Sequence, residues 1–260
     1  LPWFTTSASI SPKPPMKPYL LHEHPLRFAH RGSRVLWPEN TMVAFQGAVD
    51  LGYRYLETDL HVSSDGRVVI FHDDTLERLT NGVGRFWDHN WETLRTLDAA
   101  HHFNPAEGHP LRGKGIAMPL LEDALRTFPE AQFNLDLKQP RTESVVADEV
   151  RRLGAEDRVL IGSFHDARIR RFREVTGGRV ATSAGPREIS RAVSAAYARR
   201  PAAGASDVLQ IPERIATKRL VDAAHRGGKQ VHVWTINDPV AMRRLLDMGV
   251  DGIMSDRPDL

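Results

Sequence analysis

The chain has 260 residues, of which 41% are hydrophobic, and this is enough for one large core of the size usual for a (β/α)8 barrel. Lys and Arg number 35 against 33 acidic residues, and the resulting formal net charge of +2 gives no reason to expect a nucleic-acid partner. The sequence contains no cysteine, which excludes disulfides, thiolate metal ligands and a cysteine nucleophile, and leaves carboxylates and imidazoles as the strong ligand and proton-transfer groups.

The first 25 residues are rich in proline, at positions 2, 12, 14, 15, 18 and 25. Proline fixes the backbone and removes a donor, so we expect region 1–25 to be an extended arm on a catalytic domain that spans 26–260. No apolar run approaches the ~20 residues that cross a bilayer, and the first residues lack the layout of a signal peptide. We therefore expect a cytoplasmic or peripheral membrane protein without a transmembrane segment, while the start at Leu1 rather than Met leaves room for a removed targeting segment.

Short apolar runs alternate with amphipathic helical stretches from residue 26 onward, which is typical of βα units and a parallel sheet. The predicted strands are 26–32, 55–62, 68–72, 132–138, 159–164, 179–184, 207–211 and 230–236. Predicted helices include 41–51, 143–153 and 240–248, the last ended by Gly249. Eight strands with intervening helices predict an α/β fold, a closed (β/α)8 TIM barrel. A doubly wound open sheet is disfavoured because no Gly-rich phosphate loop follows any strand.

Region 74–118 departs from this alternation. It carries Phe86, Trp87, Trp91 and Phe103 among Gly, Pro and charged residues, without strong periodicity. A stretch of this length is more typical of an inserted subdomain or lid than of a simple loop. We therefore expect a small insertion after the third strand, whose aromatic residues form its own core or, alternatively, an apolar rim for a lipid tail.

Acidic side chains fall on two predicted strands near the ends where barrels carry their reactive groups. Glu57 and Asp59 are two positions apart, so both point to one face while Thr58 points to the other. Asp136 and Lys138 repeat this spacing. If the shared face is the barrel interior, unpaired carboxylates meet there and repel, which favours one bound divalent cation, and all-oxygen ligation favours Mg²⁺ or Ca²⁺. The alternative is that these acids form solvent-facing salt bridges.

Two histidines flank the strand that bears the first pair of carboxylates. His30 and His72 lie at the ends of the first and third predicted strands, and imidazoles titrate near neutral pH, so the two can act as base and acid. Arg31 and Lys138 add positive charge that can bind phosphoryl oxygens, although both can also serve only as counter-ions for the acids. Together these groups match the needs of in-line displacement at phosphorus, where charge on the phosphoryl oxygens must be stabilised.

Several segments resemble the glycerophosphodiester phosphodiesterase family in order and in spacing. They are Phe28-Ala29-His30-Arg31-Gly32, Pro38-Glu39-Asn40-Thr41, Leu56-Glu57-Thr58-Asp59, Asp65-Gly66, His72-Asp73, 134–138, 233–237 and 249–258. The resemblance implies a TIM barrel with an insertion after the third strand, and divalent-metal hydrolysis of a glycerophosphodiester to glycerol 3-phosphate and an alcohol. The family's acid and base histidines fall on His30 and His72, its metal carboxylates on Glu57, Asp59 and Asp136, and its phosphate-binding cations on Arg31 and Lys138.

The third carboxylate departs from part of the family pattern. It is Asp136, where many members that cleave water-soluble glycerophosphodiesters have Glu. An Asn-x-Asp-x-Lys pattern, preceded as here by 119–122 and Phe128-Pro129, is similar to members that include lysophospholipase D enzymes. The resemblance therefore leaves two small-molecule substrate classes open, glycerophosphodiesters and lysophospholipids.

Other roles remain open for two residues and for the fold as a whole. Lys138 could be the Schiff-base nucleophile of a sugar-phosphate aldolase or isomerase, but three nearby carboxylates would hold its amine protonated. A degenerate barrel that only binds a ligand would have lost at least one motif residue, and every one is present. Trp234 on the eighth predicted strand fits a core position and a substrate wall equally well. The sequence leaves the oligomeric state open.

Overall fold

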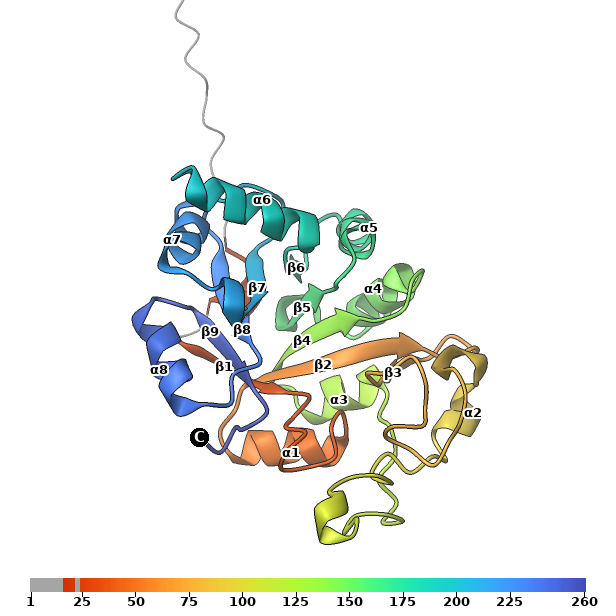
Figure 1. The fold of residues 1–260 in the computed structure, drawn as a ribbon. Coiled ribbons are helices and arrows are strands. Elements are labelled where there is room, and N and C mark those ends of the chain that lie inside the picture. Colours follow the sequence, from red (N-terminus) through yellow and green to blue (C-terminus); the bar gives the residue numbers. More distant parts are fainter. Residues whose placement is uncertain (1–15, 22–23) are drawn as a thin grey trace, which may run out of the picture.

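The computed structural model describes residues 16–21 and 24–260. Eight parallel strands follow one another in the order β6-β5-β4-β2-β1-β9-β8-β7. They are β1 (Leu26–His30), β2 (Tyr55–Val62), β4 (Gln132–Leu137), β5 (Val159–Gly162), β6 (Ala181–Thr182), β7 (Val208–Pro212), β8 (Gln230–Trp234) and β9 (Gly252–Ser255). A parallel bridge between Ser183 and Val208 joins the two ends of this order, so the barrel is nearly closed (Figure 1). The predicted TIM barrel is confirmed.

One of the eight predicted strands does not belong to the parallel barrel. β3 (Val68–Ile70) pairs antiparallel with β2 and forms a hairpin with it. The remaining barrel strand is β9, which pairs with both β1 and β8. Treating 68–72 as a barrel strand was therefore wrong, because the short connection from Val62 to Val68 permits a hairpin, whereas a parallel crossover needs a dozen or more residues.

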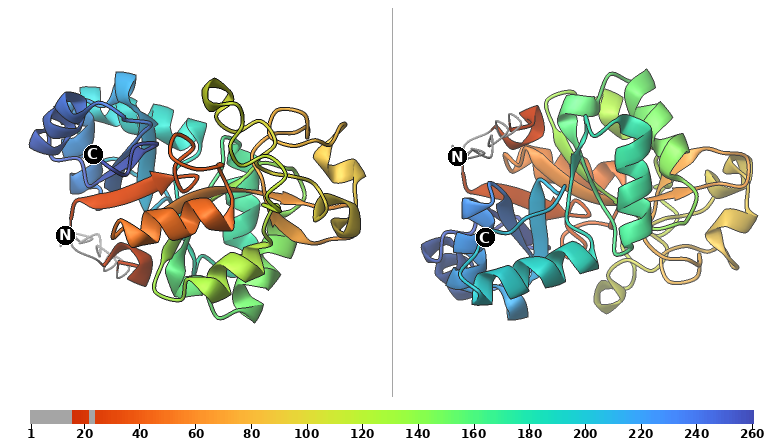
Figure 2. Two further views of the ribbon diagram at one scale, coloured as in Figure 1. Left: turned by 90° about the horizontal axis from the view of Figure 1, so that it is seen from below. Right: turned by 90° about the horizontal axis from the view of Figure 1, so that it is seen from above.

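The helices pack around the outside of the barrel (Figures 1 and 2). They are α1 (Met42–Asp50), α3 (Leu121–Thr127), α4 (Glu143–Arg152), α5 (Asp166–Thr176), α6 (Pro186–Tyr197), α7 (Lys218–Arg226) and α8 (Pro239–Asp247). Side chains cap three of these helices, α1, α7 and α8: the Thr41 hydroxyl accepts a hydrogen bond from the backbone N–H of Ala44, and the Asp238 carboxylate accepts two at the start of α8. Within the described ranges, no helix combines the length and apolar character needed to cross a membrane.

A short piece of the predicted arm is part of the core. The 3-10 helix η1 (Pro18–Leu20) buries Tyr19 completely against Tyr55, the first residue of β2, with ring centroids 5.3 Å apart. The Tyr55 hydroxyl donates to the Tyr19 carbonyl oxygen at 2.9 Å. This piece therefore packs against the end of the barrel where the strands begin, while residues 1–15 and 22–23 of the arm lie outside the described residues.

The insertion follows β3 and projects from the side of the barrel away from α7 and α8 (Figures 1 and 2). It contains η2 (Phe86–Asp88), α2 (Trp91–Leu94) and η3 (Pro105–Glu107); two further 3-10 turns of the chain are η4 (Glu156–Arg158) and η5 (Glu213–Ile215). Phe86 is fully buried and stacks on Phe71, and Leu76, Leu94 and Met118 join the same cluster. Phe86 and its neighbours thus form a core for the insertion, the first of the two roles expected for its aromatic residues.

Candidate active site

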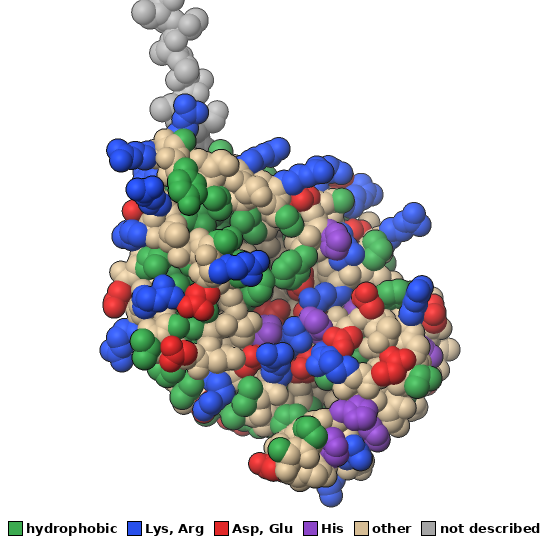
Figure 3. Space-filling model, viewed as in Figure 1, with side chains coloured by type: hydrophobic (Ala, Val, Ile, Leu, Met, Phe, Trp, Pro, Cys, Tyr) green, Lys and Arg blue, Asp and Glu red, His purple; other side chains and the backbone are tan. Residues whose placement is uncertain are grey.

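A cavity of about 470 Å³ opens at the carboxyl ends of the barrel strands, where (β/α)8 enzymes hold their catalytic groups. All the site residues predicted from the sequence line it: His30, Arg31, Glu57, Asp59, His72, Asp136, Lys138 and Trp234. Figure 3 shows acidic, basic and His side chains gathered in a hollow near the centre of this face, with hydrophobic side chains above them. The chain therefore brings the predicted residues to one place, and their chemical roles stay predictions.

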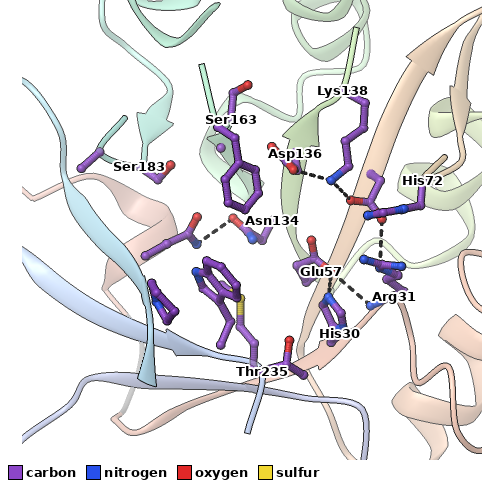
Figure 4. Close-up of a pocket in the computed structure, with 18 of the residues that line it drawn as sticks. His30, Arg31, Glu57, His72, Asn134, Asp136, Lys138, Ser163, Ser183 and Thr235 are labelled. Atoms are coloured by element: carbon purple, nitrogen blue, oxygen red, sulfur yellow. Dashed lines mark hydrogen bonds and ion pairs between the residues drawn. The ribbon is translucent and has the colours of Figure 1, made fainter. Parts of the chain in front are cut away.

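The strand register explains why these residues converge. His30 on β1 is the partner of Glu57 on β2, which in turn is the partner of Asn134 on β4. Two residues further along, Asp59 on β2 is the partner of Asp136 on β4. Neighbouring parallel strands thus carry the polar residues in matching rows, which Figure 4 shows facing one cavity.

The turn after β1 requires a glycine. Arg31 and Gly32 both have positive φ angles, 54° and 76°. A Cβ atom at Gly32 would lie 2.7 Å from the backbone of Ala44, so any larger residue would push α1 away. In this turn the Arg31 backbone N–H donates to Glu57 Oε2 at 3.2 Å.

Two of the three carboxylates are paired with cations. Lys138 Nζ lies 2.9 Å from Asp59 Oδ1 and 2.7 Å from Asp136 Oδ2, and Arg31 Nε lies 3.3 Å from Asp59 Oδ2. The expectation of unpaired carboxylates is wrong for Asp59 and Asp136, because Lys138 shares their face and reaches both. Burial favours neutral Asp59, but the charges of Lys138 and Arg31 outweigh it and hold the pKa of Asp59 well below its usual range.

The same contacts bear on the aldolase alternative. Burial alone would lower the pKa of Lys138, and the charges of Asp59 and Asp136 outweigh it, so the pKa of the amine lies above its usual range. A Schiff-base lysine must be neutral to attack a carbonyl. Lys138 is therefore suited to holding an anion and not to covalent catalysis.

The charges of Glu57 and Asp136 are only partly compensated, because Glu57 Oε2 lies 3.7 Å from His30 Nε2 and Lys138 contacts one of the two Asp136 oxygens. Burial and the nearby Asp59 charge raise the pKa of Glu57 to about 7. Asp136 Oδ1 is buried and has no hydrogen-bond partner in the described structure. These oxygens fit a hard divalent cation, which takes carboxylate ligands. Across the described residues, however, no group of three or more His, Asp or Glu side chains is arranged so that it could hold a metal ion.

Each candidate histidine is held by an aspartate that had no assigned role in the sequence. His30 Nδ1 lies 2.6 Å from Asp256 Oδ1, and His72 Nδ1 lies 2.6 Å from Asp73 Oδ1. When Nδ1 donates, the neutral ring carries its acceptor at Nε2, and both rings line the pocket. Burial lowers the pKa of His30, but the Glu57 charge and the Asp256 hydrogen bond outweigh it, so its pKa is raised.

The other half of the cavity is largely apolar and comes from the far side of the barrel, although Ser163, Ser183, Gln210 and Arg214 also line it. Phe164, which follows β5, is 61% exposed, and its ring packs edge to face with Trp234 at 5.6 Å. Ile189 on α6 and Ile215 on η5 line the same region. Trp234 also packs against a buried cluster under the pocket, so it serves both as a wall and as a core residue. Glu57, Asp59 and Asp136 are the acidic residues among those that line the cavity, and all three lie in the charged half.

Comparison with known proteins agrees with this geometry. Residues 30–260 match the model of the glycerophosphoryl diester phosphodiesterase family. The chain is 36% identical to a probable glycerophosphodiester phosphodiesterase 2 of Mycobacterium tuberculosis, over 95% of this chain and 92% of that protein. It is 31% identical to a glycerophosphodiester phosphodiesterase of Bacillus altitudinis, over 89% of this chain and 94% of that protein.

A solved structure shows the same relationship in three dimensions. The crystal structure of a glycerophosphodiester phosphodiesterase from Agrobacterium tumefaciens superposes with a TM-score of 0.77 at 26% identity, covering 90% of this chain and 96% of that one. The predicted family and the predicted enzyme class, a phosphoric diester hydrolase, are confirmed. The chain belongs to the glycerophosphoryl diester phosphodiesterase family.

Proposed function

We propose that this protein hydrolyses glycerophosphodiesters to glycerol 3-phosphate and an alcohol with the help of one bound divalent cation, Mg²⁺ or Ca²⁺. One observation carries the proposal: two histidines, each held at Nδ1 by an aspartate, line the same cavity as three carboxylates and the cations Arg31 and Lys138. The family match and the names of the relatives support the substrate class.

Glu57, Asp59 and Asp136 are the residues that would hold the cation. The buried, unpartnered oxygen of Asp136 and the raised pKa of Glu57 support this choice, because both point to positive charge missing from the site. A bound divalent cation supplies charge stabilisation for the phosphoryl oxygens and brings the substrate to the histidines. Mg²⁺ and Ca²⁺ are preferred because every proposed ligand atom is a carboxylate oxygen.

Arg31 and Lys138 would bind the phosphate group. Each is already fixed by carboxylates, Arg31 by Glu39 and Asp59 and Lys138 by Asp59 and Asp136, so their donors are oriented before substrate arrives. A preorganised guanidinium and ammonium stabilise the charge that spreads over the phosphoryl oxygens without further reorganisation.

His30 and His72 would move the protons. One Nε2 takes a proton from the attacking hydroxyl, the P–O bond to the departing alcohol breaks, and the other Nε2 gives its proton to that alkoxide. If the attacking group is the neighbouring glycerol hydroxyl, a cyclic phosphate forms, and water then opens it with the proton roles reversed. If water attacks directly, no cyclic phosphate is released.

A lysophospholipid is a second candidate substrate, and the apolar half of the cavity favours it. Phe164, Trp234, Ile189 and Ile215 offer a single acyl chain a surface that continues from the charged half. Beyond Ile215, a groove of about 440 Å³ between α6 and α7 shares Arg214 and Ile215 with the cavity. A small polar head group such as that of glycerophosphocholine would leave this surface unused.

Product release from glycerophosphocholine and from lysophosphatidylcholine, measured in parallel with Mg²⁺, Ca²⁺ or EDTA, tests the proposal. Metal-dependent release from glycerophosphocholine alone supports the small-substrate enzyme. A preference for lysophosphatidylcholine supports a lysophospholipase D. Activity that persists in EDTA, or no turnover of either compound, would contradict the site as assigned.

A further inference from the structure

A single guanidinium from the insertion bridges two carboxylates beside the active site. Arg78 Nε and Nη2 lie 2.5 and 2.8 Å from the two carboxylate oxygens of Asp73. Its Nη1 and Nη2 lie 3.2 and 2.9 Å from the two oxygens of Glu39. Two bidentate contacts from one side chain fix both carboxylates in position and orientation.

Each of the two carboxylates also accepts a hydrogen bond from a residue with a proposed role in the reaction. The Asp73 oxygen that accepts from Arg78 Nη2 also accepts from His72 Nδ1, at 2.6 Å. The Glu39 oxygen that accepts from the same nitrogen also accepts from Arg31 Nη1, at 2.8 Å. Arg78 thus stands at the centre of a chain of hydrogen bonds with a proposed acid or base at one end and a proposed phosphate ligand at the other.

Packing and hydrogen bonds within the insertion fix the backbone on both sides of Arg78. Leu76, two residues before it, is buried in the core of the insertion with Phe86 and Met118. Thr80, two residues after it, donates from its backbone N–H and its hydroxyl to the Leu76 carbonyl oxygen, at 3.0 and 2.9 Å. The backbone on both sides of Arg78 is therefore fixed, and the guanidinium extends from this small core toward the mouth of the barrel.

We infer that Arg78 is a positioning residue through which the insertion orients His72 and Arg31 for the reaction. Glu39 and Asp73 are like charges, and without a cation between them they would repel and turn toward solvent or other partners. Glu39 is only 8% exposed, so its charge depends on the two guanidiniums that contact it. Lysine offers a point charge and not a planar fork, so it cannot make both bidentate contacts.

This inference rests on the function proposed for His72 and Arg31, and turnover by Arg78→Ala tests it. We expect kcat for the preferred substrate to fall about 10- to 100-fold, the range found when a partner that orients a functional group is removed. Arg78→Lys should recover little of the loss. Arg85→Ala is the matched control, because Arg85 lies in the same insertion and makes a cation–π contact with Trp87 away from the network.

Chemical rescue separates positioning from a general loss of structure. The Arg78 side chain is 46% exposed, so its removal leaves a gap open to solvent between Asp73 and Glu39. We expect methylguanidinium to restore part of the lost kcat of Arg78→Ala in a saturable way, while the same concentration of NaCl does not and the Arg85→Ala enzyme does not respond.

The kinetic results distinguish a failure of the proposed function from a failure of the role inferred for Arg78. A wild-type enzyme that turns over neither substrate removes the proposed function, and with it this inference. An active wild type whose Arg78→Ala variant keeps kcat within about twofold overturns the inference alone. A variant with low kcat, a lowered Tm and no rescue by methylguanidinium also overturns it, since Arg78 would then only stabilise the fold.

Discussion

The two halves of the cavity are built on different principles. In the charged half, from β1, β2 and β4, Arg31, Asp59, Asp136 and Lys138 are held in ion pairs. In the apolar half, the rings of Phe164 and Trp234 pack against each other, Trp234 also packs against the barrel core, and Phe164 is largely exposed. The charged half is preorganised, which suits bond breaking, because the reaction needs charges fixed in place. The apolar half is open, which suits selection among substrates, because selection needs only an apolar contact surface.

The largest effect should come from the histidines of the charged half. His30→Ala and His72→Ala should each lower kcat about 10²- to 10⁴-fold, because each removes one proton-transfer group. Steady-state hydrolysis of the preferred substrate measures this, with Tm as the control for folding. His225→Ala, an exposed histidine paired with Asp251 on the outside of the barrel, should keep wild-type activity. A histidine variant with nearly full kcat would remove that residue from the mechanism.

Asp256→Asn, also in the charged half, should lower kcat about 10- to 100-fold, which is less than the histidine variants, since Asp256 orients His30 without touching substrate. Asp256 also raises the pKa of His30, so the NMR titration of His30 should move to lower pH in the variant. An unchanged midpoint would show that the hydrogen bond does not control the ring.

The contact between His30 and Asp256 also determines how the free energy of unfolding changes with pH. The folded pKa of His30 lies above its ordinary 6.5, so protonated His30 stabilises the fold fully below that value, and this stabilisation is lost as the pH rises through the folded pKa. Asp256 stays ionised in this range because its pKa is lowered to about 2. Asp256→Asn should therefore cost more stability at pH 5.5 than at pH 9, as measured by urea unfolding.

Metal affinity should depend on pH through Glu57. Its pKa is raised to about 7, so below that pH the carboxyl is protonated and must lose a proton before it can bind a cation. We expect Mg²⁺ or Ca²⁺ affinity to fall as the pH drops through 7, with proton uptake by the buffer in calorimetric titrations at pH 6. Glu57→Gln should abolish this proton release. Equal affinity at pH 6 and pH 8 would show that Glu57 is not a ligand.

The smallest effect should come from the apolar half. Ile189→Ser and Ile215→Ser should lower kcat/KM for lysophosphatidylcholine about tenfold, because each removes apolar contact with the acyl chain, and should leave glycerophosphocholine turnover within about twofold. Parallel kinetics with both substrates measure the ratio. Equal losses on both would mean that the apolar half serves folding and not selection.

Local patterns predicted most of the barrel and the charged half, but not the partners of its residues. The Glu57 and Asp59 spacing places both on one face from sequence alone, whereas the pairing of His30 with Asp256 joins residues 226 positions apart. Asp256 lay in a segment that resembled the family, yet no local rule told which group it would contact. Region 68–72 carried the pattern of a buried strand, and only the shortness of the preceding connection distinguished a hairpin from a barrel strand.

The apolar half was the least accessible to sequence reasoning. The sequence left two roles open for the aromatic residues of the insertion, its own core or an apolar rim, and Phe86 is buried in that core. The exposed wall comes instead from Phe164 and from Ile189 and Ile215 on separate elements, which only the closed barrel brings together.

Release of glycerol 3-phosphate from glycerophosphocholine by EDTA-treated enzyme, with Mg²⁺ or Ca²⁺ titrated back, tests whether hydrolysis depends on a bound metal ion. Activity should vanish with the chelator and return in proportion to occupancy of one site per chain. Turnover that is unchanged after complete removal of metal would contradict a metal-assisted phosphodiesterase built on Glu57, Asp59 and Asp136.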